Sequence, residues 1–566
     1  MTDTTKETPV GDDKVNEPTV ADENPLEESV SRMENYPTGI RLALILSSIY
    51  FSIFLVALDR TIIATALPKI TDKFQSFSDV GWYNAAFLLP ATALQLLFGR
   101  IYTFYPPKWI FIGEVVVFEI GSAVCGAAPN SVAFIWGRAI AGLGAAGLFN
   151  GAMIMLMYCS PLEKRPIYMG LMGAVFGVAS VAGPLLGGVF TTNVSWRWCF
   201  YINLPIGALV LAFLFRFVEN VPPALGDLPL KEKISRIDIP GTLVFIPCIV
   251  CLLLALQWGG QKYPWSDGRI IALLVLFGVL LIVFVIIQHI RQESATLPPR
   301  IAKQRSIIGA SWYAFFLGSS FFIVVYYISI WFQAIKGASA IRSGISTLPF
   351  ILGLVVATIG SGIAISKLGY YNPALIAGGI LTPIGAGLLT LFKVDTGHPM
   401  WIGVQVLFGF GVGVGLQQTN VAAQTVLDKK DAPTGVSFVF FCQGMGGAIS
   451  VAIAQNVLDN KLISGLSGIG NISPHEVANT GATDLRNVFT AEQLPEVLRI
   501  YNQALVTVFY VAVGYACAAL FGALIMEWKT IKKPQNQVKK VVKEDVEAIV
   551  PAASESSIQE DKEKVV

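Results

Sequence analysis

Charged residues are scarce in this sequence, and their scarcity excludes most classes of soluble protein. Asp, Glu, Lys and Arg make up 14% of the 566 residues, against about a quarter in typical soluble domains. Hydrophobic residues make up 54% and fall into long runs. The formal net charge is +2 and no basic patch is interleaved with aromatic residues, so we expect no nucleic-acid partner. The composition predicts a polytopic membrane protein.

Histidine is also rare, and cysteine shows no pattern of metal ligation. The chain has three histidines, none in the middle of an apolar run, and seven cysteines without the spacing of a metal site. The loops contain no nucleophile–base arrangement and no phosphate-binding loop. We therefore expect no metal, no cofactor and no enzymatic activity. Residues 1–37 are polar and acidic and lack the features of a cleaved signal peptide, so we expect them to be disordered.

Long apolar runs, in contrast, recur along most of the chain. A helix needs about 20 mostly apolar residues to cross a bilayer. The sequence offers fourteen such stretches, near residues 42–64, 82–104, 108–127, 132–157, 167–190, 199–218, 239–258, 270–290, 308–332, 345–366, 373–392, 399–420, 435–457 and 504–526. The predicted fold class is an all-α polytopic membrane protein with fourteen transmembrane helices.

The distribution of basic residues predicts the orientation of these spans. An even number of spans places both termini on one side, and Lys and Arg favour the cytoplasmic side in short loops. The loops on the side of the termini carry more of these residues than the opposite loops. Both tails are therefore predicted to be cytoplasmic and the long loop 458–503 to lie outside. This loop contains Asn471 within Asn-Ile-Ser, the pattern of an N-glycosylation site.

An internal repeat relates the fourth predicted span to the twelfth. An offset of 267 residues aligns Arg138 with Gln405, Gly142 with Gly409, Gly144 with Gly411 and Pro166 with Pro433. Transporters commonly contain such symmetry, so we expect two six-helix halves with two linker helices inserted between them. The predicted parts are a tail at 1–40, a half at 41–220, a linker at 221–300, a half at 301–528 and a tail at 529–566.

Ionisable side chains well inside the predicted spans are confined to the first half. They are Asp59, Arg60, Glu114, Glu119 and Arg138. Charges in the bilayer are costly and usually mark a functional path, so we expect the ion chemistry in this half. The second half offers amides and aromatic rings instead. Five of them are candidates for the lining of a substrate cavity: Gln405, Gln417, Gln443, Phe322 and Tyr326.

Arg138 lies in a glycine-rich span, and an estimate of depth gives it a partner. At about 1.5 Å per residue, Asp59 lies about 27 Å along the first span, and Arg138 lies about 10 Å from the outer start of the fourth. Both side chains should therefore lie in the outer half of the bundle. Either Arg138 lowers the proton affinity of Asp59 as part of proton coupling, or the two residues form a static pair that tethers two helices. We expect proton coupling.

Two further charges receive roles from the same geometry. Glu119 lies about 16 Å into the third span, near the midplane, whereas Glu114 lies about 9 Å in. Glu119 is therefore the better candidate for an internal acid, and its alternative role is a contact between helices. Arg60 points about 100° away from Asp59 around the helix and is expected to be structural or to lie at the outer interface.

Four motifs occur in the first half of the chain. They are Leu58–Pro68 in the first span, Arg138 with Gly142 in the fourth, Gly173–Gly188 in the fifth and Trp196–Pro205 at the start of the sixth. Together they resemble motifs of the major facilitator superfamily, specifically the fourteen-span drug:proton antiporters of the fungal efflux-pump type. The resemblance implies an antiporter motif at Gly173, Gly177, Gly183, Pro184, Gly187 and Gly188. One position departs from the family pattern, because Thr103 replaces the aspartate expected in the loop after the second span.

The resemblance implies export of amphipathic small molecules, such as drugs, toxins or secondary metabolites, by alternating access. The proton gradient would supply the energy, and protons, substrate and bilayer lipids would be the partners of a monomeric pump that confers multidrug resistance. The expected location is the cell membrane. The alternatives are a fourteen-span importer or vacuolar transporter of siderophores or basic amino acids, and a non-transporting sensor.

Overall fold

The computed structural model describes residues 36–76, 79–223, 225–226, 228–260, 262–466, 489 and 493–532. Most of residues 1–37, predicted to be disordered, most of the predicted tail 529–566 and the predicted glycosylation site Asn471 lie outside these residues. The described chain is almost entirely helical and contains two isolated β-bridges but no β-strand. The predicted all-α fold is confirmed.

The first half of the chain forms the helices on one side of the bundle. These are α2 (Gly39–Phe74), α3 (Val80–Ala93), α4 (Gln95–Phe104), α5 (Pro107–Ala127), α6 (Ser131–Cys159), α7 (Arg165–Asn193), α8 (Trp198–Tyr201) and α9 (Asn203–Phe217). The linker follows, with α10 (Leu230–Arg236), α11 (Ile239–Trp258), α12 (Gly268–Arg291), the 3₁₀ helix η2 (Gln292–Ser294) and α13 (Pro299–Ala302).

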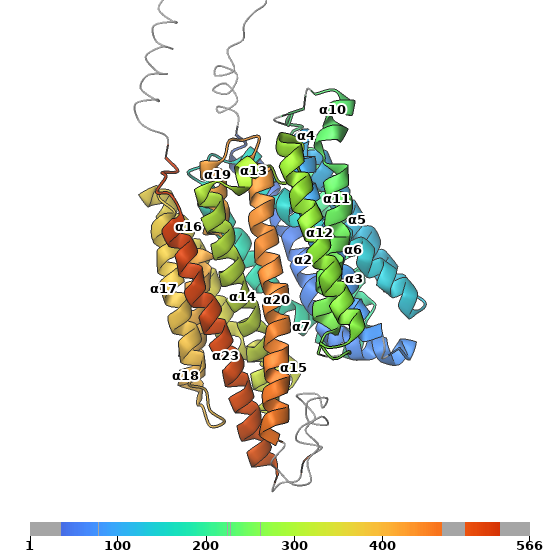
Figure 1. Ribbon diagram of the computed structural model, residues 1–566, viewed down its shortest axis with the longest axis vertical. Helices are drawn as coiled ribbons and strands as arrows, with labels where there is room; N and C mark the ends of the chain where they lie inside the picture. Colours follow the sequence, from blue (N-terminus) through green and yellow to red (C-terminus); the bar gives the residue numbers. More distant parts are fainter. Residues whose placement is uncertain are drawn as a thin grey trace, which may run out of the picture.

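The second half lies beside the first and ends the described chain (Figure 1). Its helices are α14 (Arg305–Ala334), α15 (Ala340–Ser346), α16 (Leu348–Leu368), α17 (Asn372–Leu389), α18 (His398–Gly415), α19 (Gln418–Val426), α20 (Ala432–Leu466) and α23 (Leu494–Ile525). Thirteen helices of the described chain are long and apolar enough to cross a membrane, or fourteen if α3 and α4 form one span. The predicted number of spans agrees with this count.

The second predicted span is bent rather than straight. Helices α3 and α4 meet at Leu94 with an angle of 41° between them. Pro90 in the last turn of α3 has no N–H, and its ring disfavours a regular helix at this point. At two other helix ends, a single residue explains where the helix begins or ends. The side chain of Asn130 caps α6, and α16 ends at Gly369, whose φ of +88° suits glycine.

Both described ends of the chain lie at the same end of the bundle, which we call the terminal end; the opposite end is the distal end (Figure 1). At the terminal end, Arg41 at the start of α2 pairs with Glu219 just beyond α9, with 2.6 Å between nitrogen and oxygen. Residues 526–532, the C-terminal strap, fold back onto the second half. There the amide of Ile531 donates to the carbonyl of Gly369 at 2.8 Å. Each end of the chain is thus tied to its own half.

The inserted helices α11 and α12 form a hairpin against the outside of the bundle, beside α3 and α20 (Figure 1). Trp258 of α11 packs edge-on against Trp82 of the first half, with 6.0 Å between ring centroids. Phe245 of α11 packs against Phe441 of the second half at 5.3 Å. The linker therefore contacts both halves, while α12 presents most of its apolar side chains outward, as a lipid-facing helix does.

The internal repeat recurs in the contacts of the two halves. Arg138 donates through Nε to the carbonyl oxygen of Tyr83 at 3.1 Å. Its counterpart Gln405 donates through Nε2 to the carbonyl oxygen of Ser346, also at 3.1 Å. In both halves, a long polar side chain of the fourth helix therefore binds a main-chain oxygen of the second.

The glycines of the repeat have equivalent contacts as well. A Cβ atom at Gly142 would overlap the carbonyl of Phe87, and a Cβ atom at Gly409 would overlap the carbonyl of Phe350. Small residues at such positions let two membrane helices approach at the level of their backbones. The shared glycines are therefore explained by packing, whereas the charge of Arg138 has no counterpart in the second half.

Candidate functional site

A buried ion pair lies at the centre of the first half. Arg138 Nη1 of α6 lies 2.5 Å from Asp59 Oδ2 of α2, and both side chains are fully buried. The guanidinium also lies 4.5 Å above the ring of Phe87 of α3. The second carboxylate oxygen of Asp59 and Nη2 of Arg138 have no hydrogen-bond partner within the described chain. The structure thus brings together the two residues that the depth estimate placed at the same level.

An aromatic cluster covers the distal side of this pair. Phe134, one helical turn before Arg138, packs edge-on against Tyr83 at 5.0 Å and against Phe200 at 5.3 Å between ring centroids. Trp196 completes this contact at 6.0 Å from Phe134. Trp196 and Phe200 belong to the motif at the start of the sixth span. That motif therefore supplies apolar bulk beside the ion pair, which limits its access to water.

Arg60 lies inside the bundle and not at its outer interface. Its guanidinium carbon lies 5.6 Å from the ring centroid of Phe87 and 5.3 Å from that of Phe149. The Nε atom is buried without a hydrogen bond. This position differs from the interfacial one, because the side chain turns toward α3 and α6, whereas the structural role stays a prediction.

Two acidic residues of α5 are buried at different places. Glu119 faces α9, where the carboxylate occupies the space that a side chain at Gly207 would fill, and neither of its oxygens has a hydrogen-bond partner within the described residues. Glu114 is 3% exposed against 8% for Glu119. It accepts a hydrogen bond of 2.5 Å from the hydroxyl of Tyr102. Depth along the helix had made Glu114 the weaker candidate, but the direction of its side chain buries it more completely.

The predicted antiporter motif gives α7 two contact faces. On one face, Gly183 and Gly187 contact α2, where Cβ atoms would overlap the hydroxyls of Thr61 and Thr65. Gly173, Gly177 and Gly188 form the other face, which contacts the second half. There the Cβ of a residue at Gly188 would lie 3.1 Å from the side chain of Ile341. Because Thr61 follows Asp59 and Arg60, α7 connects the charged part of α2 with the second half.

Pro184 lies within α7 next to Gly183 and does not interrupt the helix. It lies beside Gly344 of α15, where an added Cβ atom would be 3.7 Å from Cβ of the proline. The main-chain oxygen of Ala179, five residues before Pro184, accepts a hydrogen bond of 3.3 Å from the hydroxyl of Thr61. A side chain of α2 therefore binds the backbone of α7 close to its proline, where the helical hydrogen bonding is weakest.

The two halves meet closely at the terminal end. A Cβ atom at Gly362 of α16 would overlap the carbonyl oxygen of Pro166 at the start of α7. The equivalent contact joins Gly99 of α4 to α20, where a Cβ atom would lie 3.3 Å from the carbonyl oxygen of Pro433 and would overlap Ser437. These contacts relate the two prolines of the repeat. They close the terminal end through two pairs of backbones.

The five predicted cavity residues occupy different environments. Gln405 binds the backbone, as described above, and Gln417 lies against Gly173 of α7, with an unpaired Oε1 among the described atoms. Gln443 and Phe322 pack where α14 meets α20. Tyr326 is 51% exposed, which separates it from the other four. Gln417 thus contacts the first half directly.

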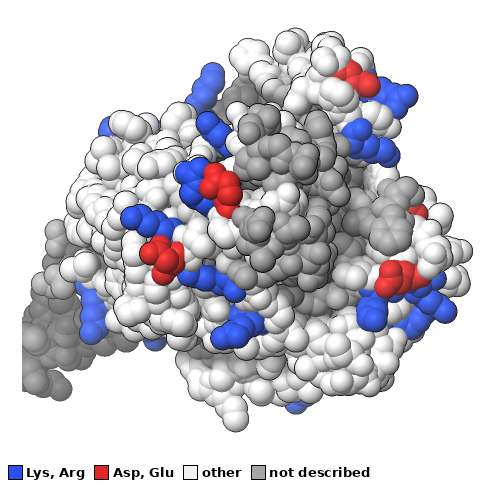
Figure 2. Space-filling view, turned by 90° about the horizontal axis from the view of Figure 1, so that it is seen from below, with Lys and Arg blue, Asp and Glu red and all other residues white. Residues whose placement is uncertain are grey.

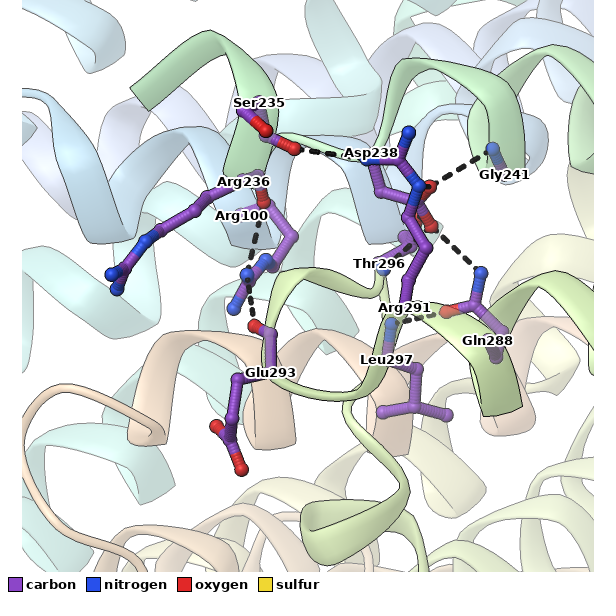
Figure 3. Close-up of polar contacts among 10 residues, drawn as sticks. All are labelled: Arg100, Ser235, Arg236, Asp238, Gly241, Gln288, Arg291, Glu293, Thr296 and Leu297. Carbon is purple, nitrogen blue, oxygen red and sulfur yellow. Dashed lines mark hydrogen bonds and ion pairs between the residues drawn. The ribbon is translucent and has the colours of Figure 1, made fainter. Parts of the chain in front are cut away.

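A polar network joins the linker to the first half at the terminal end (Figure 3). Arg100 of α4 donates through Nη2 to the carbonyl oxygens of Arg236 and Glu293, both at 3.0 Å. Thr103, which replaces the family's aspartate, donates to the carbonyl of Gly99 within its own helix at 3.1 Å. Helix α4 contains no carboxylate side chain. Its basic residue, Arg100, therefore binds main-chain oxygens of the linker.

Asp238 is the centre of this network and is fully buried (Figure 3). Its Oδ1 caps α11 by accepting from the amide of Gly241 at 3.0 Å. Its Oδ2 accepts from Gln288 at 2.7 Å and from both the amide and the hydroxyl of Thr296 at 2.9 Å. Nε of Arg291 lies 3.5 Å from Oδ1 of Asp238. This single carboxylate therefore holds three segments of the linker together.

Arg300 extends the network to the second half. It forms ion pairs with Glu293 at 3.1 Å and with Asp431, just before α20, at 2.9 Å. The hydrogen bonds to these two carboxylates raise the pKa of Arg300 above its usual value. Its side chain is half exposed, so each pair contributes modestly to stability. The sequence of contacts from Arg100 through Glu293 and Arg300 to Asp431 connects the two halves by way of the linker.

Comparison with known proteins gives this arrangement a family. Residues 49–451 match the model of the Major Facilitator Superfamily. The chain belongs to the major facilitator superfamily. This superfamily consists of membrane transporters and not of enzymes, so the chain is a multi-pass membrane transporter.

Relatives within the major facilitator superfamily match most of the chain. It is 51% identical over 500 residues to the "MFS-type efflux pump MFS1" of Trichophyton rubrum, covering 88% of this chain and 93% of that protein. It is 49% identical over 497 residues to the "Rubrofusarin-specific efflux pump aurT" of Gibberella zeae, covering 88% and 91%. The solved proton:xylose symporter XylE shares the fold, with a TM-score of 0.57 and 13% identity over 87% of this chain and 97% of that one. The predicted fungal efflux-pump type is confirmed.

The distal face of this superfamily member carries few charges (Figure 2). Basic and acidic residues form several small groups there, separated by surface of neither sign. Acidic groups lie beside basic ones in the visible part of this face.

Proposed function

We propose that the chain is a proton-coupled antiporter that exports amphipathic small molecules across the cell membrane by alternating access. The observation that carries this proposal is the buried Asp59–Arg138 ion pair beside the α2–α7 contact. The efflux pumps at about half identity support export as the direction. In this proposal the terminal end faces the cytoplasm, in keeping with the excess of basic residues in the loops of that side.

Proton binding at Asp59 would act on the ion pair. Asp59 accepts a hydrogen bond from the guanidinium of Arg138, which keeps its charge at any physiological pH. A proton that reaches Asp59 from the distal side would remove one charge of the pair and weaken the link between α2 and α6. The cost of leaving the buried Arg138 without its counter-ion then favours a different position of α2.

The movement of α2 would reach the second half through α7. Thr61 of α2 contacts Gly183 and binds the backbone near Pro184, and the opposite face of α7 contacts α15 and α16. Glycine contacts of this kind let neighbouring helices approach at the level of their backbones, so a shift of α2 would press directly on α7. We call the contact region between the two halves the seam. Opening of the Gly362–Pro166 and Gly99–Pro433 contacts would then expose the seam to the cytoplasm, and closing these contacts would allow it to open toward the distal side.

The test compares export in cells that produce the wild-type chain or Asp59→Asn. Cells loaded with rhodamine 6G should lose the dye faster with the wild-type protein, and a protonophore should abolish the difference. Asp59→Asn should reach the membrane at a similar level and lose the proton-driven part of export. Asp395→Asn is a matched control, because Asp395 lies on an exposed loop.

Four outcomes would contradict the proposal. Full export by Asp59→Asn would show that this carboxylate carries no proton. Export that is insensitive to a protonophore would remove the coupling. Dye accumulation instead of dye loss would reverse the direction and favour an importer, and location of the protein in the vacuolar membrane would favour compartmental storage.

A further inference from the structure

Arg60 is a permanent cation inside the bundle without an anionic partner. Its neighbour Asp59 is engaged by Arg138, and Arg60 forms no ion pair or hydrogen bond within the described chain. An arginine side chain cannot release its proton to escape this cost, whereas a lysine or histidine could. The side chain is partly buried and its Nε is fully buried without a partner, which is unfavourable unless an anion neutralises the guanidinium at some stage.

Aromatic rings surround the guanidinium and lead to the seam between the halves. Phe149, 5.3 Å from the guanidinium carbon of Arg60, lies 6.2 Å between ring centroids from Phe176 of α7. It also lies 6.3 Å from Phe440 of α20, in the second half. Cation–π attraction to Phe87 and Phe149 offsets part of the burial cost but adds no negative charge. The rings of Phe149, Phe176 and Phe440 are all partly exposed.

We propose that Arg60, Phe149, Phe176 and Phe440 form a substrate site for planar aromatic anions. An ionised phenol or carboxyl group would pair with the guanidinium, and the aromatic body would stack between rings contributed by both halves. This inference rests on the proposed transport function and names the class of substrate that the seam binds. Because the rings come from α6, α7 and α20, a relative rotation of the halves assembles or separates the site.

The geometry distinguishes this site from the proton site. Asp59 and Arg60 are adjacent in sequence but have different partners: Asp59 is bound by Arg138, whereas Arg60 lies beside Phe149, which packs against Phe176 and Phe440. Both guanidinium groups lie near the ring of Phe87, so the two sites are neighbours. A neutral or cationic molecule gains the stacking contacts but not the ion pair. The charge of the substrate is therefore the property that Arg60 selects.

Two xanthene dyes of opposite charge test the proposal: fluorescein, an anion at neutral pH, and rhodamine 6G, a cation. The full-length protein is reconstituted in lipid nanodiscs, and binding is measured by fluorescence anisotropy without a proton gradient. The wild-type protein should bind fluorescein more tightly. Arg60→Gln should weaken fluorescein binding at least tenfold, or about 1.4 kcal/mol, and leave rhodamine 6G binding unchanged or stronger.

Three further variants separate a binding role from a structural one. Arg60→Lys should retain part of the preference for fluorescein, because it keeps the charge but not the planar shape. Phe149→Leu should weaken both dyes, because it removes the stacking surface. Arg342→Gln removes an equal charge from an exposed position and should change neither dye.

The proposal is overturned if the wild-type protein does not prefer fluorescein, or if Arg60→Gln weakens both dyes equally or neither. The failure of the antiport mechanism gives a different result. In that case the charge preference and its loss in Arg60→Gln persist in nanodiscs, while transport into vesicles does not respond to a pH gradient.

Discussion

Removal of both members of the central ion pair separates its structural role from its role in coupling. Asp59→Asn leaves Arg138 buried and without a counter-ion, since both side chains are fully buried in the native structure. Loss of one partner of such a pair costs about 3–5 kcal/mol in the free energy of unfolding. The double variant Asp59→Asn with Arg138→Gln leaves no charge. It also imitates the second half, where Gln405 alone binds the carbonyl of Ser346. Most of the stability should therefore return.

The measurement combines stability with transport. Thermal unfolding of the purified proteins should place the double variant between Asp59→Asn and the wild type, and close to the wild type. Export driven by a pH gradient in reconstituted vesicles should remain absent in both variants. If the double variant regained export together with stability, the pair would be a tether of α2 to α6 and the proton role would be refuted.

The other contacts of the seam and the linker make comparable predictions. Gly362→Leu should block closure of the terminal end, because its side chain would overlap the carbonyl of Pro166. Overpacking by about 1–3 kcal/mol shifts the balance between the closed and open states by about 5- to 150-fold. The cytoplasmic accessibility of cysteines introduced near the contact should therefore rise. Asp238→Ala leaves several buried donors unpaired at about 1–3 kcal/mol each, so the midpoint of thermal unfolding should fall. Gly183→Ala brings a methyl group against the hydroxyl of Thr61 on α2 and should lower the rate of export while the protein remains folded.

Matched variants control for the substitutions themselves. Gly360→Leu lies on the same helix as Gly362, at a position where an added Cβ meets nothing within 4 Å, and should leave accessibility unchanged. Asp267→Ala removes the cap of α12, which accepts one hydrogen bond in an exposed setting, and should cost about 1 kcal/mol. Gly188→Ala meets the flexible side chain of Ile341 and should reduce export less than Gly183→Ala does. Equal effects within any of these pairs would contradict the corresponding contact.

The sequence predicted those features that depend on long-range periodicity and on rare residues. Apolar runs gave the number of spans because the bilayer sets their length. The isolated charges at positions 59 and 138 gave the ion pair, because depth along two antiparallel helices is easily estimated. The repeat gave Gln405 as the counterpart of Arg138, and the structure adds that both bind the same kind of main-chain oxygen.

Features that depend on side-chain direction and on tertiary contacts could not be obtained in this way. The angle between Asp59 and Arg60 around α2 follows from helix geometry, but the sequence does not show which neighbouring helix lies in each direction. Burial of Glu114 depends on a hydroxyl twelve residues earlier in the chain. Asp238 resembles any N-terminal cap, and its further partners come from residues about 50 or more positions away. Long-range polar contacts have no local pattern.

Each end of the described chain is attached to its own half, so a relative movement of the halves changes the distance between the two ends. The start of α2 is tied to the end of α9, and the C-terminal strap is tied to the turn that follows α16. Both points lie at the same end of the bundle (Figure 1). Two fluorescent reporters, placed before residue 36 and after residue 532, would follow different rigid bodies. Energy transfer between them depends on their separation and would therefore report, in a living cell, the relative movement of the halves during transport.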